Sequence, residues 1–246
     1  MSAANVTVAV RCRPWIGRQN EADEATRRCI VTMSEDGKVI VEDPEAQDGR
    51  RLFKFDHAIW SHSPQDGHYK DQAWVYNNIG KKLLDDATVG YNSVVFAYGQ
   101  TGSGKTFSMA GSKDQPGITP LLIGDLFKWR AAEIAKSKAS ERINVNVKLT
   151  YCEIYMEKVH MRGPSVPVSS IDHRLRSHRQ VRDLLAKKAT SKSSDLKIRE
   201  NKLLGPFLEG ANVELVATTE QMHKLLAEGN ERRKVAATKM NEASSR

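Results

Sequence analysis

One stretch of the chain has the residue types and the spacing of a phosphate-binding loop. The sequence GQTGSGKT, residues 99–106, matches the pattern G-x-x-x-x-G-K-[ST]. The glycines let the backbone wrap closely so that successive N–H groups can point at phosphate oxygens, Lys105 can reach the β- and γ-phosphates, and Thr106 can offer its hydroxyl to Mg²⁺. The residues that we expect to bind nucleotide here are Gly99, Gln100, Thr101, Gly102, Ser103, Gly104, Lys105 and Thr106.

Hydrolysis needs more than this loop. It also needs an acidic Mg²⁺ partner that follows a strand, and a group that positions the attacking water. Asp125 follows the apolar stretch LLIG, but it falls inside a predicted helix, and we find no good candidate elsewhere in the 246 residues. The sequence therefore predicts nucleotide binding more firmly than it predicts turnover.

The elements around the loop alternate between strand and helix patterns. An apolar run at 91–98 is typical of a strand leading into the loop, and FSMAG can open a helix after it. Apolar residues at helical spacing predict helices, and alternating ones predict strands. The main expectations are strands near 6–10, 38–43, 51–57, 142–155, 195–200 and 211–217, and helices over 72–88, 117–136 and 218–240. This interleaving predicts the α/β class.

Composition fits one large α/β domain without a disulfide framework. Apolar residues make up 39% and charged residues 28% of the chain, and no apolar run approaches the length of a membrane span. Cys12, Cys29 and Cys152 have neither CxxC spacing nor an even number, which favours a reduced, cytosolic setting. The net charge of +8 suits a polyanionic partner or a solvated basic surface.

Three stretches, taken in order, carry a resemblance to a known family. They are VAVRCRPW, FAYGQTGSGKT and VAATKMNEASSR, and together they resemble the kinesin motor domain. The stretch LKIRENKLLGPFLEG is most similar to the class-three kinesins. The resemblance implies a phosphate-loop NTPase fold, in which a central, mainly β-sheet carries helices on both faces. It also implies an ATP- and Mg²⁺-dependent motor that moves on microtubules, located in the cytoplasm and on the cytoskeleton.

The last six residues, NEASSR, resemble the first part of the kinesin switch I motif, N-x-x-S-S-R-S-H. The resemblance places Asn241, Ser244, Ser245 and Arg246 beside the γ-phosphate, with Ser245 also a Mg²⁺ ligand and Arg246 paired with a switch II glutamate. The switch II segment D-L-A-G-x-E does not occur in these 246 residues. We therefore expect the chain as given to be catalytically incomplete.

The resemblance also assigns a base site. Arg11, Arg13 and Pro14 match the R-x-R-P segment beside the adenine, and Phe107 matches the position that stacks on the base. From the residues alone, Phe107 could also be a core residue at a helix start. Tyr76 could flank the nucleotide or lie in the core.

Two other classes of function stay open. The chain could be a non-catalytic nucleotide-binding or microtubule-associated remnant of a kinesin, or an unrelated phosphate-loop enzyme such as a small kinase. An unrelated phosphate-loop enzyme would need a catalytic acid downstream of the loop, and we do not find one. Nucleic acid would suit the charge, but no nucleic-acid motif is present. Cargo, direction of movement, oligomeric state and regulation cannot be read from these residues.

One segment interrupts the resemblance. Removing residues 160–181 joins EIYMEKV directly to RDLL, as in the family. The segment contains Pro164 and Pro167, few apolar residues and no clear periodicity, so we expect a disordered surface loop if it is translated. We favour an in-frame retained intron over a functional insertion, because long loops are uncommon in compact turn regions.

Overall fold

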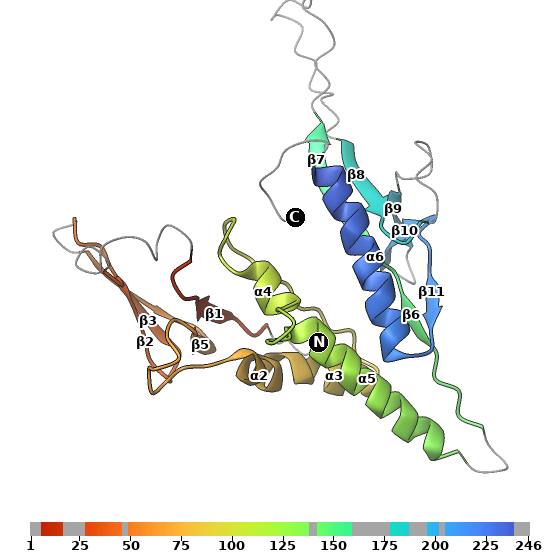
Figure 1. Ribbon diagram of the computed structural model, residues 1–246, viewed down its shortest axis with the longest axis horizontal. Coiled ribbons are helices and arrows are strands. Elements are labelled where there is room, and N and C mark those ends of the chain that lie inside the picture. Colours follow the sequence, from red (N-terminus) through yellow and green to blue (C-terminus); the bar gives the residue numbers. More distant parts are fainter. Residues whose placement is uncertain are drawn as a thin grey trace, which may run out of the picture. The chain divides into compact units, whose positions relative to one another are not determined.

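The computed structural model describes residues 6–16, 28–45, 49–137, 142–158, 178–186, 196–201 and 205–238. The chain divides into two compact units, residues 1–125 and 126–246, which we describe separately. Strands and helices occur in both units, which confirms the predicted α/β class (Figure 1). Among the described residues, no helix combines the length and the apolar character that a bilayer crossing requires.

Five strands of the first unit form two small sheets. β1 (Ala9–Cys12) pairs in parallel with β5 (His57–Trp60). β2 (Val31–Met33), β3 (Lys38–Glu42) and β4 (Arg50–Lys54) form an antiparallel sheet in that order. The strands expected from the alternating patterns near residues 6–10, 38–43 and 51–57 are therefore present, with shifted ends.

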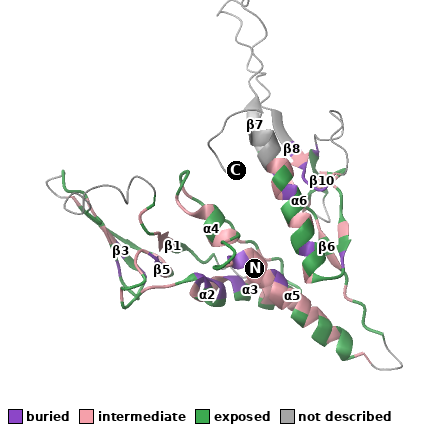
Figure 2. Ribbon diagram, viewed as in Figure 1, coloured by how far each residue is buried: buried purple, intermediate pink, exposed green. Residues whose placement is uncertain are grey.

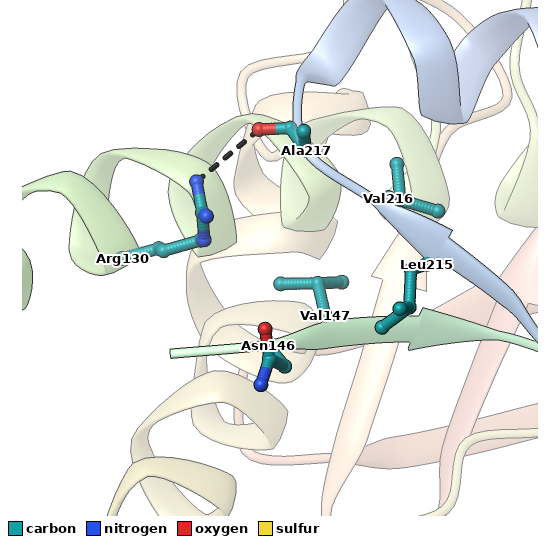
Figure 3. A pocket seen from close by; sticks show the side chains of 6 residues that line it. All are labelled: Arg130, Asn146, Val147, Leu215, Val216 and Ala217. Atoms are coloured by element: carbon teal, nitrogen blue, oxygen red, sulfur yellow. Dashed lines mark hydrogen bonds between the residues drawn. The ribbon is translucent and has the colours of Figure 1, made fainter. Parts of the chain in front are cut away.

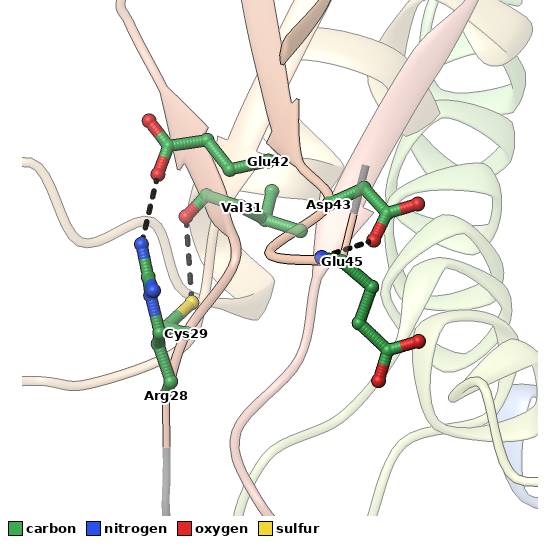
Figure 4. Close-up of polar contacts among 6 residues, drawn as sticks. All are labelled: Arg28, Cys29, Val31, Glu42, Asp43 and Glu45. Atoms are coloured by element: carbon green, nitrogen blue, oxygen red, sulfur yellow. Dashed lines mark hydrogen bonds and ion pairs between the residues drawn. The ribbon is translucent and has the colours of Figure 1, made fainter. Parts of the chain in front are cut away.

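One ion pair to β3 and one local hydrogen bond lie at the beginning of β2 (Figure 4). The Arg28 guanidinium lies 3.5 Å from the Glu42 carboxylate, and the Cys29 thiol donates to the Val31 carbonyl oxygen at 3.4 Å. Both partners of the ion pair are exposed, so this pair contributes under about 1 kcal/mol. The stability of this sheet therefore comes from its apolar face.

β5 lies between two apolar clusters because successive strand side chains point to opposite sides. Ala58 and Trp60 pack on the side of β2 and β3, and Ile59 packs on the side of the helices. The buried members are Met33, Val39, Ala58 and Trp60 in one cluster, and Ile59, Val75 and Ile118 in the other. β5 thus links the small sheet to the helical part of the unit.

One continuous helical run follows, as the periodicity of 72–88 predicts. It consists of α2 (Gln72–Val75), one π-helical turn η1 (Tyr76–Gly80), and α3 (Lys81–Thr88). Asp71 caps α2 by accepting a hydrogen bond from the Trp74 N–H at 2.7 Å. In η1, a Cβ on Gly80 would lie 2.6 Å from the Tyr76 ring, so glycine lets that ring pack against the helix.

The predicted strand before the loop is not formed. Residues 91–98 have no strand partner among the described residues, and the side chains of Val94, Phe96 and Tyr98 are 82%, 80% and 95% exposed. A strand is defined by hydrogen bonds to its neighbours, so apolar, β-favouring residues alone cannot make one. The prediction of a strand over 91–98 was wrong for this structure, because an apolar sequence pattern does not show which strand would pair with it.

The loop leads into two helices. α4 (Lys105–Met109) is short and begins inside the loop motif, and α5 (Ile118–Ala135) is long (Figure 1). α5 starts one residue after the beginning of the predicted helix 117–136, and Pro120 lies in its first turn, where a missing N–H is tolerated.

The strands of the second unit form three antiparallel pairs. The pairs are β6 (Val147–Leu149) with β11 (Glu214–Val216), β7 (Cys152–Lys158) with β8 (His178–Asp183), and β9 (Lys197–Asn201) with β10 (Gly205–Glu209). The single strand expected over 142–155 is divided between β6 and β7. At the break, the Tyr151 carbonyl oxygen accepts a hydrogen bond from the Leu184 N–H at 2.9 Å.

β8 begins inside the segment 160–181 that we expected to be inserted. Its residues from His178 to Val181 pair with β7, whereas residues 160–177 lie outside the described residues. The last four residues of the segment are therefore part of a described strand, and the boundary at Val181 stays a prediction.

α6 (Thr219–Thr238) closes the described chain and follows the predicted helix 218–240 closely. Its start is capped by Thr218, whose hydroxyl accepts from the Gln221 N–H at 3.2 Å, while the Gln221 side chain accepts from the Ala217 N–H at 2.9 Å. This exchange is a variant of the capping box. Figure 2 shows buried, intermediate and exposed residues along the described part of the helix, as expected for a helix with one packed face.

Candidate nucleotide-binding site

The loop 99–106 is a tight, glycine-dependent turn at the start of α4. Gly102 and Gly104 have φ values of 79° and 98°, in the left-handed region that other residues rarely adopt. The Ser103 N–H donates to the Gln100 carbonyl oxygen at 3.2 Å, which closes the turn. The sequence motif therefore folds as a compact backbone loop.

Lys105 is held by its own loop. Its ammonium group donates to the carbonyl oxygens of Gly99 at 2.8 Å and Gln100 at 2.9 Å. A compact ammonium charge inside a ring of backbone groups is suited to bind an anion, which can replace the two carbonyl oxygens as its partner.

Thr106 follows Lys105 on α4 and is exposed. Its hydroxyl is the kind of hard oxygen ligand that Mg²⁺ accepts, and Mg²⁺ typically takes one or two protein ligands together with phosphate oxygens and water. One hydroxyl at the loop fits that pattern. Within the described ranges, no group of three or more His, Cys, Asp or Glu residues could hold a metal ion by itself.

Arg13 connects the end of β1 to the loop. Its Nε donates to the Gly102 carbonyl oxygen at 2.7 Å, and its Nη1 donates to the carbonyl oxygen of the neighbouring Pro14 at 2.7 Å. The structure therefore brings the segment that the resemblance assigns to the adenine against the phosphate loop.

Arg11 lies deeper in the same unit and is anchored by three hydrogen bonds. Its Nε donates to Ser61 Oγ at 2.9 Å, and its Nη1 donates to Gln72 Oε1 at 2.6 Å and to Ser108 Oγ at 3.0 Å. Burial lowers the pKa of Arg11, an effect that Tyr69 and Asp71 partly offset. Arg11 is thus an ordered, partly desolvated cation and not the exposed strand charge that the pattern alone would suggest.

Phe107 meets this cation. The guanidinium carbon of Arg11 lies 5.4 Å from the centre of the Phe107 ring, within the range of a cation–π contact. The ring is partly exposed, so one side remains accessible. The geometry brings together Arg11, Arg13, Pro14, Phe107 and the loop.

Three residues of this network were missed by the sequence reasoning: Ser61, Gln72 and Ser108. A signal existed for Gln72, because it lies three residues before Val75 and therefore on the buried face of the predicted helix. A polar residue at such a position needs a hydrogen-bond partner. No local pattern identifies the two serines.

Tyr76 belongs to the core. It is buried, and its hydroxyl donates to the Asp125 carboxylate at 2.7 Å. Burial, and then this hydrogen bond to Asp125, raise the pKa of Tyr76. Asp125 lies in α5, as expected, and accepts this hydrogen bond there.

The switch-like residues Asn241, Ser244, Ser245 and Arg246 lie outside the described residues. Their assignment to the γ-phosphate therefore stays a prediction.

A cavity of about 110 Å³ lies in the second unit (Figure 3). Its lining residues are Arg130, Asn146, Val147, Leu215, Val216 and Ala217. The Arg130 guanidinium donates to the carbonyl oxygens of Val145 at 2.8 Å and Ala217 at 3.2 Å, so it fastens α5 to β6 and β11. These contacts indicate a structural role for the arginine.

Known proteins with similar sequences belong to one family. The model of the kinesin motor domain matches residues 11–161 and 178–246, and leaves out 162–177. Kinesin-like protein KIF1A of Rattus norvegicus is 37% identical over 249 residues, which cover 100% of this chain and 13% of that protein. Kinesin-like protein KIF13A of Homo sapiens is 38% identical over 252 residues, which cover 100% of this chain and 12% of that protein.

Comparison with solved structures indicates the same family as the sequence comparison. A KIF14 dimer with AMP-PNP in complex with a microtubule has a TM-score of 0.72 at 29% identity, covering 98% of this chain and 58% of that one. A fast kinesin has a TM-score of 0.71 at 28% identity, covering 96% of this chain and 55% of that one. The chain thus has the kinesin motor α/β fold. It corresponds to a little more than half of each of the two solved chains. Taken with the loop geometry, the matches show that the chain belongs to the kinesin motor-domain family, with KIF1 and KIF13 relatives of class three.

Proposed function

We propose that this chain binds MgATP through residues 99–106 as part of an ATP-driven microtubule motor. The observation that carries the proposal is the position of Lys105, whose ammonium group is bound to the Gly99 and Gln100 carbonyl oxygens in a loop with two left-handed glycines. Nucleotide phosphates are the ligands that such a loop accommodates best.

Each part of the site has a proposed task. Lys105 and the loop N–H groups bind the β- and γ-phosphates, and Thr106 supplies a Mg²⁺ ligand. Arg11, Arg13, Pro14 and Phe107 form the base side. Asn241, Ser244, Ser245 and Arg246 act at the γ-phosphate, with Ser245 as a second Mg²⁺ ligand, as the family resemblance implies.

The microtubule is the proposed macromolecular partner, and the cytoplasmic cytoskeleton the proposed location. The support is twofold: solved KIF14 structures with ADP and with AMP-PNP are complexes with a microtubule, and the net charge of +8 suits an acidic surface. This chain spans only 12% to 13% of its KIF1A and KIF13A relatives, so motility is a property proposed for the whole protein.

Residues 1–246 alone are proposed to bind nucleotide without turning it over. They contain no D-L-A-G-x-E segment, which would supply the acidic group and the partner of Arg246.

The nucleotide proposal is tested by titrating a fluorescent ATP analogue with Mg²⁺ into the wild-type chain and Lys105→Ala. Removing a charged hydrogen-bond donor should weaken binding by roughly 10- to 100-fold. Lys113→Ala, which removes a nearby exposed lysine, is the matched control and should bind as wild type. Equal affinities for wild type and Lys105→Ala would refute the assignment.

Turnover is tested separately by phosphate release from the 246-residue chain with and without microtubules. Turnover above background would contradict the proposal that these residues are catalytically incomplete.

The segment 160–181 is proposed to be an insertion or a retained intron, and the family match leaves out residues 162–177 within it. Sequencing the transcript across codons 155 to 190 distinguishes the two. A mature message that encodes GPSVPVSSIDHR would exclude the intron.

A further inference from the structure

A buried amide joins two of the residues on the base side of the site, Arg11 and Phe107. Gln72 is only 5% exposed, and its Oε1 accepts from Arg11 Nη1 at 2.6 Å. Its Nε2 donates to the Phe107 carbonyl oxygen at 2.7 Å and to the Gln115 carbonyl oxygen at 3.4 Å. Both ends of the amide are therefore used.

The two partners come from different elements. Arg11 belongs to β1 and Phe107 to α4, and Gln72 reaches both from the first turn of α2. α2 is itself fixed, because Asp71 caps it and Val75 is buried in the core cluster. Gln72 thus fixes the positions of the Arg11 guanidinium and the Phe107 main chain relative to α2.

Only an amide satisfies both contacts. A glutamate would keep an acceptor for Arg11 but would set carboxylate oxygens against two carbonyl oxygens, and a methionine of similar length would provide neither hydrogen bond. Ser61 and Ser108 would still hold Arg11 after such a change. The contact to the Phe107 main chain would be lost.

The phosphate side does not depend on this amide. The hydrogen bonds of Gln72 reach Arg11, Phe107 and Gln115, and none of these residues lies within 99–106. The Lys105 ammonium is held by carbonyl oxygens of the loop itself.

We propose that Gln72 is a positioning residue for the nucleotide base, setting the spacing of Arg11 and Phe107 so that it governs affinity for the base and leaves affinity for the phosphates unchanged. The inference rests on the proposed nucleotide-binding function. Gln72 acts by positioning Arg11 and Phe107, and it does not itself contact the reacting atoms.

The test compares two ligands, ATP and inorganic tripolyphosphate, each with Mg²⁺ and each titrated calorimetrically into the 246-residue chain. Gln72→Met should weaken ATP binding by about tenfold, the size expected from losing a buried hydrogen bond to a charged partner. Its affinity for tripolyphosphate should stay at the wild-type value. The matched control is Gln65→Met, at an exposed glutamine, which should change neither affinity.

Gln72→Glu covers the case in which the methionine variant does not fold. It keeps the acceptor for Arg11 and loses the donor to Phe107, so ATP should bind more weakly than to wild type while tripolyphosphate binds equally well. For a variant whose circular dichroism spectrum matches that of wild type, an equal loss for both ligands, or no loss for either, overturns the inference. A wild-type chain that binds neither ligand instead overturns the proposed nucleotide function.

Discussion

The backbone of Gly229 in α6 touches the ring of Tyr151 so closely that a Cβ on Gly229 would lie 2.5 Å from the Tyr151 Cδ1 atom. The ring cannot turn away freely, because its hydroxyl donates to Asn230 at 2.8 Å. Glycine in a helix normally costs about 1 kcal/mol relative to alanine. Here glycine is required despite that cost, because a larger residue would prevent α6 from packing against Tyr151, between β6 and β7.

Gly229→Ala should therefore destabilise the chain by about 1–3 kcal/mol, because overpacking outweighs the gain in helix propensity. Gly124→Ala should have the opposite effect. Gly124 also lies in a helix, but a Cβ there meets nothing within 4 Å, so a stabilisation of about 0.5–1 kcal/mol is expected. Urea-induced unfolding followed by circular dichroism measures both. Two shifts of the same sign would contradict this contrast.

Asp183→Asn should destabilise the chain by about 2–3 kcal/mol. The Asp183 carboxylate is buried and accepts three hydrogen bonds at 2.8 Å, from the Leu185 N–H and from the main-chain and side-chain nitrogens of Asn212. An amide would direct its own N–H groups at these donors. Asp114→Asn, at an exposed aspartate, is the control and should change the free energy of unfolding by under about 0.5 kcal/mol. A similar effect of both substitutions would exclude the anchoring role.

Cys29 should be the first cysteine alkylated by iodoacetamide. Cys29 is exposed, whereas burial, followed by the neighbouring Cys29, raises the pKa of the Cys12 thiol to about 11. About one Cys12 thiol in a thousand is then ionised at pH 8, and only the thiolate reacts. Burial and Asp183 also raise the pKa of Cys152. Peptide mass spectrometry over a time course gives the order, and Cys29→Ser should remove the fastest phase. Faster labelling of Cys12 would refute the burial argument.

Tyr76→Phe should cost about 1 kcal/mol near pH 8, through loss of the hydrogen bond to Asp125. The cost should shrink in alkali. Because the pKa of Tyr76 is raised in the folded state, the unfolded tyrosine loses its proton first, near pH 10, and the contribution declines as pH rises further. Urea unfolding of both proteins at pH 9 and pH 11 measures the difference. A difference that is constant with pH would show that the hydroxyl does not titrate as described.

Features set by neighbours along the chain were predictable. The loop 99–106 and the helices over 72–88 and 218–240 each depend on residues within a few positions of one another, so their sequence patterns suffice. β10 was not expected, because its five residues begin with Gly205 and Pro206, which are both unfavourable in strands. It exists through its pairing with β9.

Features set by distant partners were not predictable. Arg11 obtains its hydrogen bonds from Ser61, Gln72 and Ser108, which lie 50, 61 and 97 residues away. The break at Tyr151 likewise depends on Leu184 and Gly229. A motif identifies which residues do chemistry, but the residues that hold them in place are chosen by packing, which a single sequence does not reveal.

The exposed run before the phosphate loop has a consequence for biosynthesis. Val94, Phe96 and Tyr98 are exposed to solvent in a segment whose backbone has no strand partner among the described residues. Apolar extended segments of this kind aggregate readily and are what general chaperones bind. The yield of these 246 residues in a cell should then depend on chaperone supply.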